Sequence, residues 1–558
     1  MTTTMSGARM GAANLARRLV TRALARDLTA FVAPGLDVAR AYGLDPTAAG
    51  LRVVPTPRHA TVLLLVGEVP AGLRAATAVA YAQMARPRAI IALGTDGAPP
   101  LPAPDVAAAL DQAALVAGVE ELRRIIASGA WTPDAPVFDA PDVQPKEDDG
   151  GGMDHGGMDM GDMTHGDMSG DTGNGGGDTG NGGDDTGNGG DDTGAGGGDR
   201  GGMDMDMGGG GMSMVMMTKG LPRSPDGLPM EWVEAPVGPL FPGLPGGLAL
   251  SFTLDGDVVA AATVSSGAVG RGLDAIWTGP AASLPERLAL LDPFAPVSYR
   301  LLATRAIENA VGAAVDATTA DARVGALERE RAVSHLGWLA LFARLLGDRW
   351  LEMRAAALQF ILLRTDDRAT IARVRGEVGV FARRVRRTPY LTRRLAGIGT
   401  PRTERNEAAR FTAGSLPRGP VARAAGLADD ARAGDPTYHR LSFAPVVRAR
   451  NDAWARLDVR LTELEQSLDL ALAAGAVTMP DRPLPPRVEG AGAAVVETPR
   501  GAAILRLRVE GGMVQDAMLD TPSLHNETLV TTVAEGREMA DALVGVASLD
   551  LSPWEMDR

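Results

Sequence analysis

A segment poor in large apolar side chains, residues 141–217, divides this chain into two blocks that can fold. The segment consists mainly of Gly, Asp, Met and Thr. A sequence of this composition buries too little apolar surface to offset the entropy lost on ordering. We therefore predict a flexible linker. Before it we expect an amphipathic helix over residues 1–35 and a small domain over residues 36–140, and after it a larger domain over residues 218–558.

The bulk composition sets the class of protein. With 558 residues, 45% of them hydrophobic, the chain is long enough for two or three domains with substantial cores. Its net charge of -14 argues against a nucleic-acid binder, because phosphate binding needs concentrated Lys and Arg. No apolar run approaches the roughly 20 residues that cross a bilayer, and no signal-peptide core is recognisable. We expect a cytoplasmic protein, soluble or peripheral on the inner face of the cell membrane.

The N-terminal helix has two dissimilar faces. One carries leucines and the other carries arginines, at Leu15, Leu19, Leu24 and Leu28 and at Arg17, Arg18, Arg22 and Arg26. Such a helix can lie on an anionic membrane or on a partner. An ordinary amphipathic helix docked on its own domain fits the pattern equally well.

Two folding patterns follow from the hydrophobic periodicity. Strand-like and helix-like segments alternate in the small domain, which is typical of a parallel α/β fold: strands at Leu51–Pro55, Thr61–Val66 and Ala89–Leu93, with helices at Leu73–Met84 and from Asp105. The larger domain is mainly helical, with amphipathic stretches at Val297–Val315, Asp321–Leu346, Trp350–Leu363 and Asp452–Ala474 and strands at Leu248–Leu254, Val258–Thr263 and Ala503–Val509.

The small domain resembles a known subunit. The segment PTPRHATVLLLVGEVPAGLRAATAVAYAQMARPRAIIALGTDG, Pro55–Gly97, is similar to the small, cluster-bearing subunit of respiratory complex I and of [NiFe] hydrogenases. The resemblance implies a flavodoxin-like parallel sheet. Asp96 stands where that family has a cluster cysteine, and the chain contains no cysteine at all. A [4Fe–4S] cluster with ordinary thiolate ligands is therefore excluded.

The C-terminal domain resembles the large subunit, the 49-kDa type of complex I and its hydrogenase counterparts. The similar segments follow in the family's order: 238–259, GRGLD at 270–274, LERERAVSHL at 327–336, 418–432, 451–468, ETPRG at 497–501 and 548–558. The resemblance implies a mainly α-helical α+β fold. It also implies that membrane subunits of a complex I-like or antiporter-like assembly are the partners, with other redox subunits as further candidates.

The positions of the family's active centre have changed. Where hydrogenases hold nickel and iron with two C-x-x-C pairs, the resemblance places Asp292 and Ala295, then Ser552 and Glu555. No nickel–iron site is expected. Complex I instead receives quinone with histidines in the opening hairpin, and this chain carries Phe241 and Pro245 there. The usual donor to a quinone headgroup is absent.

Several residues remain candidates for chemistry. Asp292 and Glu555 as a pair suit a hard cation or a proton relay, or they form salt bridges with Arg271, Arg300 or Arg558, which we prefer. Ser552 belongs to the same degenerate site. His335, on a helix beside Glu328 and Arg331, is interpreted as a packing residue. A further set is expected to hold loops: Arg423, Asp430, Arg432, Asp452 and Arg456.

The linker contains the clearest metal-binding composition. Thioethers and imidazoles suit copper, and they occur at Met153, His155, Met158, Met160, Met163, His165 and Met168. The alternative is an unconstrained expansion of Met and Gly. A seven-residue repeat follows, with Asp at 171, 178, 185, 192 and 199, and we interpret it as a spacer.

The leading functional interpretation is a fused small-subunit and large-subunit homologue without cofactors. It would serve as a peripheral structural or coupling subunit of an ion-translocating membrane complex. The second interpretation is an NADH-quinone oxidoreductase-type subunit, with quinone binding and, at the level of the family, NAD binding in a redox complex. The third is a copper-binding protein acting through the linker. Whether the chain is an enzyme stays open at this point.

Overall fold

The computed structural model describes residues 21, 23, 25–128, 232–265, 274–401, 416–480 and 488–556. The predicted linker, its copper-site candidates between Met153 and Met168, and most of the predicted N-terminal helix lie outside these residues. Among the described helices, none combines the length and the apolar composition needed to cross a membrane.

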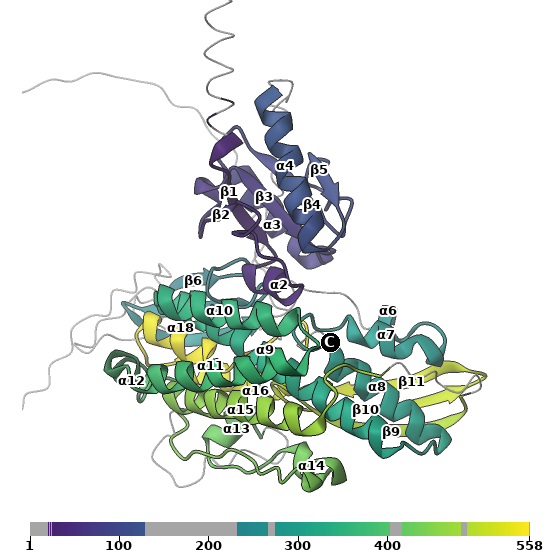
Figure 1. Ribbon diagram of the computed structural model, residues 1–558. Helices are drawn as coiled ribbons and strands as arrows, with labels where there is room; N and C mark the ends of the chain where they lie inside the picture. Colours follow the sequence, from purple (N-terminus) through teal and green to yellow (C-terminus); the bar gives the residue numbers. More distant parts are fainter. Residues whose placement is uncertain are drawn as a thin grey trace, which may run out of the picture. The chain divides into compact units, whose positions relative to one another are not determined.

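The N-terminal region is a five-stranded, fully parallel sheet (Figure 1), in the order β2-β1-β3-β4-β5. Its strands are β1 (Thr29–Ala33), β2 (Arg52–Val53), β3 (Val62–Val66), β4 (Ala89–Leu93) and β5 (Val106–Ala108), and its helices are α2 (Leu36–Ala41), α3 (Ala71–Gln83) and α4 (Gln112–Ser128). The three central strands are buried along their whole length. The sequences of these strands are almost entirely apolar, because helices cover both faces of a parallel sheet.

Two predictions for this region were wrong at their edges. Residues 29–33 form β1 and do not belong to an N-terminal helix, because Thr29–Ala33 is buried throughout and pairs with two neighbouring strands. The helix predicted from Asp105 begins only at Gln112. Before it, β5 pairs with Ile91–Leu93 of β4.

Each face of the sheet has its own core. On one face, α3 supplies Leu73, Ala78 and Tyr81. On the other, α4 supplies Leu115 and Val119. Both cores also receive side chains from the C-terminal region: Leu240 packs against the first, and Trp554 and Phe294 pack into or against the second. The two regions therefore share apolar cores.

The C-terminal region is mainly helical, as predicted. Its helices are α6 (Asp274–Trp277), α7 (Leu284–Ala289), α8 (Pro296–Val311), α9 (Ala317–Leu345), α10 (Arg349–Leu363), α11 (Arg368–Arg386), α12 (Pro389–Leu395), α13 (Gly419–Ala424), α14 (Pro436–Arg440), α15 (Ala453–Ala474), α16 (Pro522–Asn526), α17 (Val530–Ala534) and α18 (Met539–Ala547). Short 3₁₀ helices occupy Pro57–His59, Ala281–Ser283, Ala431–Gly434 and Glu527–Leu529. The long helix α9 packs against α10 and α15.

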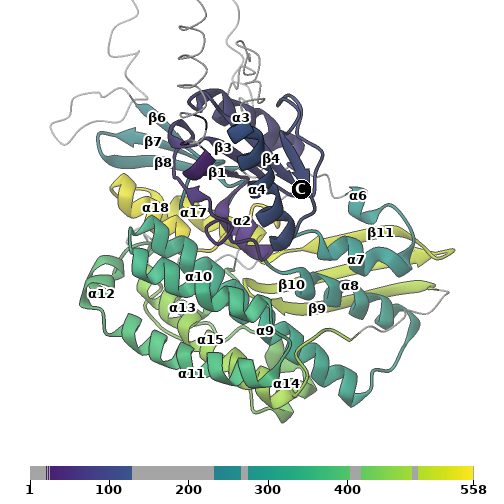
Figure 2. The same cartoon turned by 45° about the horizontal axis from the view of Figure 1, so that its top comes forward.

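Two antiparallel sheets accompany these helices (Figure 2). The first has the order β6-β7-β8 and comprises β6 (Val233–Val237), β7 (Ala249–Asp255) and β8 (Val258–Ser265). The second has the order β11-β10-β9 and comprises β9 (Gly490–Thr498), β10 (Gly501–Glu510) and β11 (Met513–Asp520). Helix α8 packs on the second sheet, and α17 and α18 pack on β8 of the first sheet. The first sheet and α9 contribute side chains to one large core.

Candidate functional site

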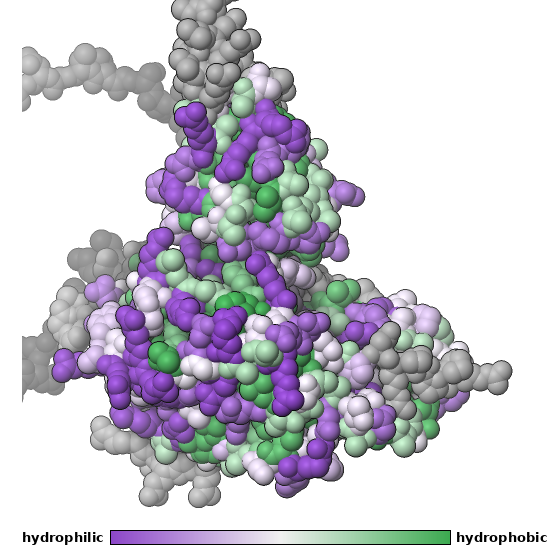
Figure 3. All heavy atoms as spheres, viewed as in Figure 1, coloured by the Kyte–Doolittle hydropathy of each residue, from purple (hydrophilic) through white to green (hydrophobic). Residues whose placement is uncertain are grey.

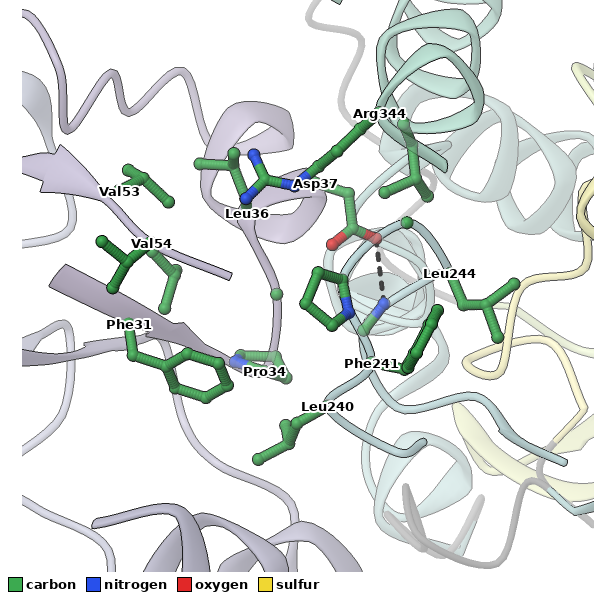
Figure 4. Close-up of a pocket in the computed structure, with 16 residues that line it drawn as sticks. Phe31, Pro34, Leu36, Asp37, Val53, Val54, Leu240, Phe241, Leu244 and Arg344 are labelled. Atoms are coloured by element: carbon green, nitrogen blue, oxygen red, sulfur yellow. Dashed lines mark hydrogen bonds between the residues drawn. The ribbon is translucent and has the colours of Figure 1, made fainter. Parts of the chain in front are cut away.

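The end of β1 meets a loop of the C-terminal region at very close range (Figure 4). The Asp37 carboxylate, at the start of α2, accepts a hydrogen bond of 3.0 Å from the Gly246 backbone N–H. A Cβ atom on Gly246 would lie 2.6 Å from the Pro34 carbonyl oxygen, so only glycine allows this approach. Burial raises the pKa of the Asp37 carboxyl above its usual range. The contact fixes the opening hairpin loop against the parallel sheet.

Little space remains at this contact. The pocket between the two regions has a volume of about 40 Å³ and is lined by Phe31, Pro34 and Phe241, among others. Small-molecule sites usually occupy about 300–1,000 Å³. Pro245, the second position at which the family carries histidine, is buried beside this loop. Leu240 is partly buried and packs against one core of the sheet.

The candidate active-centre carboxylates lie around one arginine, Arg500. Its Nη1 atom is 2.9 Å from Asp292 Oδ2 and 4.0 Å from Glu555 Oε1, and its Nε atom is 3.4 Å from Asp550 Oδ1. All four side chains are buried. We call these residues and Tyr299 the Arg500 cluster. Figures 1 and 2 show the elements that supply it, α8, the turn between β9 and β10, and the C-terminal segment.

Hydrogen bonds hold Glu555 on its other side. Tyr299 donates its hydroxyl to Glu555 Oε1 over 2.8 Å, and Ser523 donates its hydroxyl to Glu555 Oε2 over 2.5 Å. Burial raises the pKa of Glu555 to about 7, against the opposing influence of Arg500. Ser552 lies next to this group, and its backbone N–H donates to Ser523 Oγ over 3.0 Å.

Of the three arginines predicted to pair with the two carboxylates, the one that the structure describes does not do so. Arg300 pairs with Glu286 on the exposed side of its helix, and Arg271 and Arg558 lie outside the described residues. Arg500, which occupies this place, belongs to the ETPRG segment. That segment resembles the large-subunit family, but nothing in its sequence distinguishes Arg500 as the central cation.

A second buried group, the framework cluster, surrounds Arg423. Its Nε atom is 2.6 Å from Glu463, and its Nη1 atom is 2.8 Å from Glu497 and 2.9 Å from Asp430. Arg432 joins Asp430 to Glu328 at 2.8 and 3.2 Å. Buried charges are tolerated when they are paired in this way. The cluster fixes α9, α13, α15 and β9 to one another.

His335 lies within the framework cluster. Its Nε2 atom is 3.0 Å from Glu463 Oε2. Burial lowers the pKa of His335 to about 4, whereas the nearby guanidinium groups hold the pKa of Glu463 well below its usual range. The pair at neutral pH is therefore a neutral imidazole that donates to a carboxylate. At the start of α15, Asp452 caps the helix by accepting from the Ala455 N–H at 2.8 Å.

One turn connects the two clusters. Arg331 donates to the carbonyl oxygens of Glu497 and Thr498, both over 2.7 Å. Two residues later, Arg500 enters the Arg500 cluster. The turn lies directly against the start of α13, where a Cβ on Gly419 would be 2.0 Å from the Arg500 carbonyl oxygen. The backbone of this turn is therefore held from both sides.

The donor groups present do not suit the family's metal centres. The Arg500 cluster offers carboxylates and hydroxyls around a guanidinium, whereas iron–sulfur and nickel–iron centres take thiolates. Asp96 is exposed in an open hollow of about 590 Å³ that also includes Glu68 and Arg74. Within the described part of the chain, no group of three or more His, Cys, Asp or Glu side chains is placed to hold a metal ion.

Comparisons with known proteins concern mainly the C-terminal region. Residues 365–484 match the family described as respiratory-chain NADH dehydrogenase, 49 Kd subunit. One subunit of the NADH-quinone oxidoreductase of Desulfotalea psychrophila is 28% identical over 375 residues, which cover 59% of this chain and 98% of that protein. Membrane-bound hydrogenase subunit alpha of Pyrococcus furiosus is 27% identical over 369 residues, covering 57% and 86%.

A solved structure has a similar fold. It belongs to the membrane-bound sulfane sulfur reductase, an archaeal respiratory membrane complex, and it aligns with a TM-score of 0.52 and 24% identity. The alignment covers 59% of this chain and 99% of the other. The C-terminal part of this chain is thus a large-subunit-like domain, homologous to the 49-kDa-type subunit of complex I and to the large subunits of membrane-bound hydrogenases.

Proposed function

We propose that the chain is a peripheral structural or coupling subunit of a complex I-like or hydrogenase-like membrane assembly, in which ion pairs replace the cofactor sites. The arrangement of Arg500 carries this proposal. The Arg500 guanidinium already forms ion pairs with Asp292, Asp550 and Glu555. A metal ion at the same place would have to displace this buried cation, which breaks three ion pairs at once.

The N-terminal region supports the same proposal. The strand order β2-β1-β3-β4-β5 is that of flavodoxin-like sheets, which bind ligands where the strand order reverses, at the ends of β1 and β3. Here the opening loop of the C-terminal region meets the end of β1, with Gly246 against Pro34 and Leu240 packed against one core of the sheet. We infer that this region is a small-subunit-type domain whose binding crevice has become a contact surface.

A quinone-linked role has one observation in its favour. A hollow of about 840 Å³ lies between α2 and α10 and is lined by Leu36, Val54, Met353 and Phe360 as well as by arginines. This volume is within the range of small-molecule sites. The narrow space at Phe241 offers no comparable room for a headgroup. We therefore retain quinone binding as the second candidate.

Purification of the intact assembly tests both candidates. The tagged protein would be isolated from its native cells in mild detergent and examined by mass spectrometry, metal analysis and quinone extraction. Membrane subunits without stoichiometric iron, nickel or quinone support the coupling role. Stoichiometric quinone together with redox subunits contradicts it and supports the second candidate.

Two variants sharpen this test. Asp292→Asn and Glu555→Gln keep the size of each side chain but remove its charge. Loss of turnover by an assembly of unchanged composition would contradict a purely structural role and favour a proton relay at these carboxylates. Deletion of residues 150–217 addresses copper separately, since a copper-buffering function requires copper tolerance to fall while the assembly stays intact.

A further inference from the structure

The exposed side of α10 and α11 carries arginines between large apolar side chains. We call these residues the basic stripe: Arg349, Trp350, Met353, Val380, Arg383, Arg384 and Arg387. Val380, Arg383 and Arg384 of α11 and its C-cap residue Arg387 are spaced i, i+3, i+4 and i+7, which places them along one side of a helix. Figure 3 shows hydrophilic and hydrophobic residues interspersed over these helices.

Contacts between the helices hold the stripe together. The Arg384 guanidinium carbon is 3.9 Å from the centre of the Trp350 ring, and the Trp350 ring lies 5.9 Å from the ring of Phe381. The aromatic ring is thus fixed between the two helices with an arginine on its face. The stripe is one continuous surface built by two helices.

The described part of the chain does not neutralise the charges of the stripe. On the flanks of α11, Arg375 pairs with Asp469 and Arg386 pairs with Asp458. Within the described residues, no ion pair joins Arg349, Arg383 or Arg387 to an acid. In a chain of net charge -14, this is a local concentration of unpaired positive charge.

The same surface exposes apolar groups. Met353 is 59% exposed, Val380 is 60% exposed, and Trp350 is 39% exposed. On the adjoining helix α12, Tyr390 is 60% exposed. Arginines with interleaved Trp, Tyr and aliphatic side chains are typical of protein surfaces at the membrane–water interface.

We propose that the basic stripe binds the surface of a membrane that contains anionic phospholipids. Arginines near such a surface attract lipid headgroups, while the aromatic and aliphatic side chains enter the interface. This inference rests on the proposed function, because it assigns the side of a peripheral subunit that faces the bilayer. A nucleic acid fits less well, because aliphatic groups such as Met353 and Val380 contribute nothing to phosphate binding.

Vesicle flotation tests the inference. The full-length protein would be floated with phosphatidylcholine vesicles that either contain or lack phosphatidylglycerol. We expect binding only to the anionic vesicles, with a partition coefficient that falls with added salt. Each arginine at an anionic surface raises partitioning by about fivefold. The variant R349Q/R383Q/R387Q should therefore partition about a hundredfold more weakly.

A matched variant controls for net charge. R58Q/R86Q/R506Q removes three exposed arginines elsewhere and should bind like the wild type. Arg384 is kept because it stacks on Trp350, and the N-terminal arginines are present in all three proteins. Equal thermal melting of the variants confirms that the fold is intact.

The outcomes separate this inference from the proposed function. Equal binding by the stripe variant and the control variant, or equal binding to neutral vesicles, overturns the inference. Stripe-dependent binding to duplex DNA and not to vesicles overturns it as well. If such a result accompanies normal co-purification with membrane subunits, the coupling role stands and only the stripe is misassigned. Failure to co-purify with membrane subunits refutes the coupling role itself.

Discussion

Replacing Arg500 by methionine removes the one cation that three buried carboxylates share. Methionine fills part of the same volume but leaves Asp292 and Glu555 without this counter-charge, whereas Asp550 keeps an ion pair of 3.5 Å with the buried Arg460. An acid deprived of its buried partner either stays charged at a large cost or takes up a proton. We therefore expect Arg500→Met to destabilise the C-terminal region, and more strongly at high pH.

The magnitude follows from the distances. At an effective dielectric constant of about 20, pairs of 2.9, 3.4 and 4.0 Å each contribute about 4–6 kcal/mol of Coulomb attraction. Desolvation of the buried ions offsets most of this sum. Removing one partner of a buried ion pair typically costs about 3–5 kcal/mol, and we expect a loss in this range at pH 8.

Urea unfolding of the full-length protein, followed at pH 5 and pH 8, measures the effect. The control is Arg506→Gln, which removes an exposed arginine from the same strand, β10, and should shift stability by less than about 0.5 kcal/mol. Burial raises the pKa of both Asp292 and Glu555. Without Arg500 these pKa values rise further, so protonation at pH 5 should restore part of the lost stability.

A rescue variant makes the reasoning refutable. Adding Asp292→Asn and Glu555→Gln to Arg500→Met removes two of the uncompensated charges and should recover a large share of the loss. If Arg500→Met costs less than about 1 kcal/mol, or if its cost is the same at both pH values, Arg500 does not neutralise these carboxylates.

Three other perturbations have defined outcomes. Burial raises the pKa of Glu330 to about 7, so the free energy of unfolding falls as the pH rises from about 4.5 to 7. In Glu330→Gln, urea unfolding should no longer show this loss of about 3 kcal/mol. Burial lowers the pKa of His335 to about 4, so the free energy of unfolding falls as the pH drops from about 6.5 to 4. In the same urea assay, His335→Gln should not show this loss of stability at acidic pH. Gly246→Ala forces a methyl group onto the Pro34 backbone and should lower the melting temperature by the equivalent of about 1–3 kcal/mol, whereas Gly376→Ala, with nothing within 4 Å, should raise it slightly.

Periodicity was sufficient for the strongly patterned elements. The unbroken apolar run of β3 and the amphipathic repeats of α9, α10 and α15 predicted those elements, because the spacing of their apolar residues indicates both the type of element and its buried side. Strand β5 was missed because Val106–Ala108 is short and only its first residue is buried. Its pairing with β4 makes it a strand, and such a long-range contact leaves no local pattern.

The candidate site also combines features that the sequence predicts with features that depend on long-range contacts. The resemblance placed Asp292 and Glu555 at one centre, and the structure brings both to Arg500. Which arginine pairs with the carboxyl groups depends on long-range contacts, because Arg500 is 208 residues from Asp292 and 50 residues from Asp550 in the sequence. The chain has 55 Lys and Arg residues, and spacing alone cannot select among them.

The turn between β9 and β10 makes the two buried clusters interdependent in evolution. Its carbonyl groups are held by Arg331 and its arginine by Asp292 and Asp550, so a substitution in either cluster disturbs the other through one short peptide. Exchange of Arg500 alone leaves buried carboxylates without their shared cation, and coordinated exchanges avoid that intermediate. We therefore expect strong epistasis: among related proteins, the residues at positions 292, 500, 550 and 555 should change together.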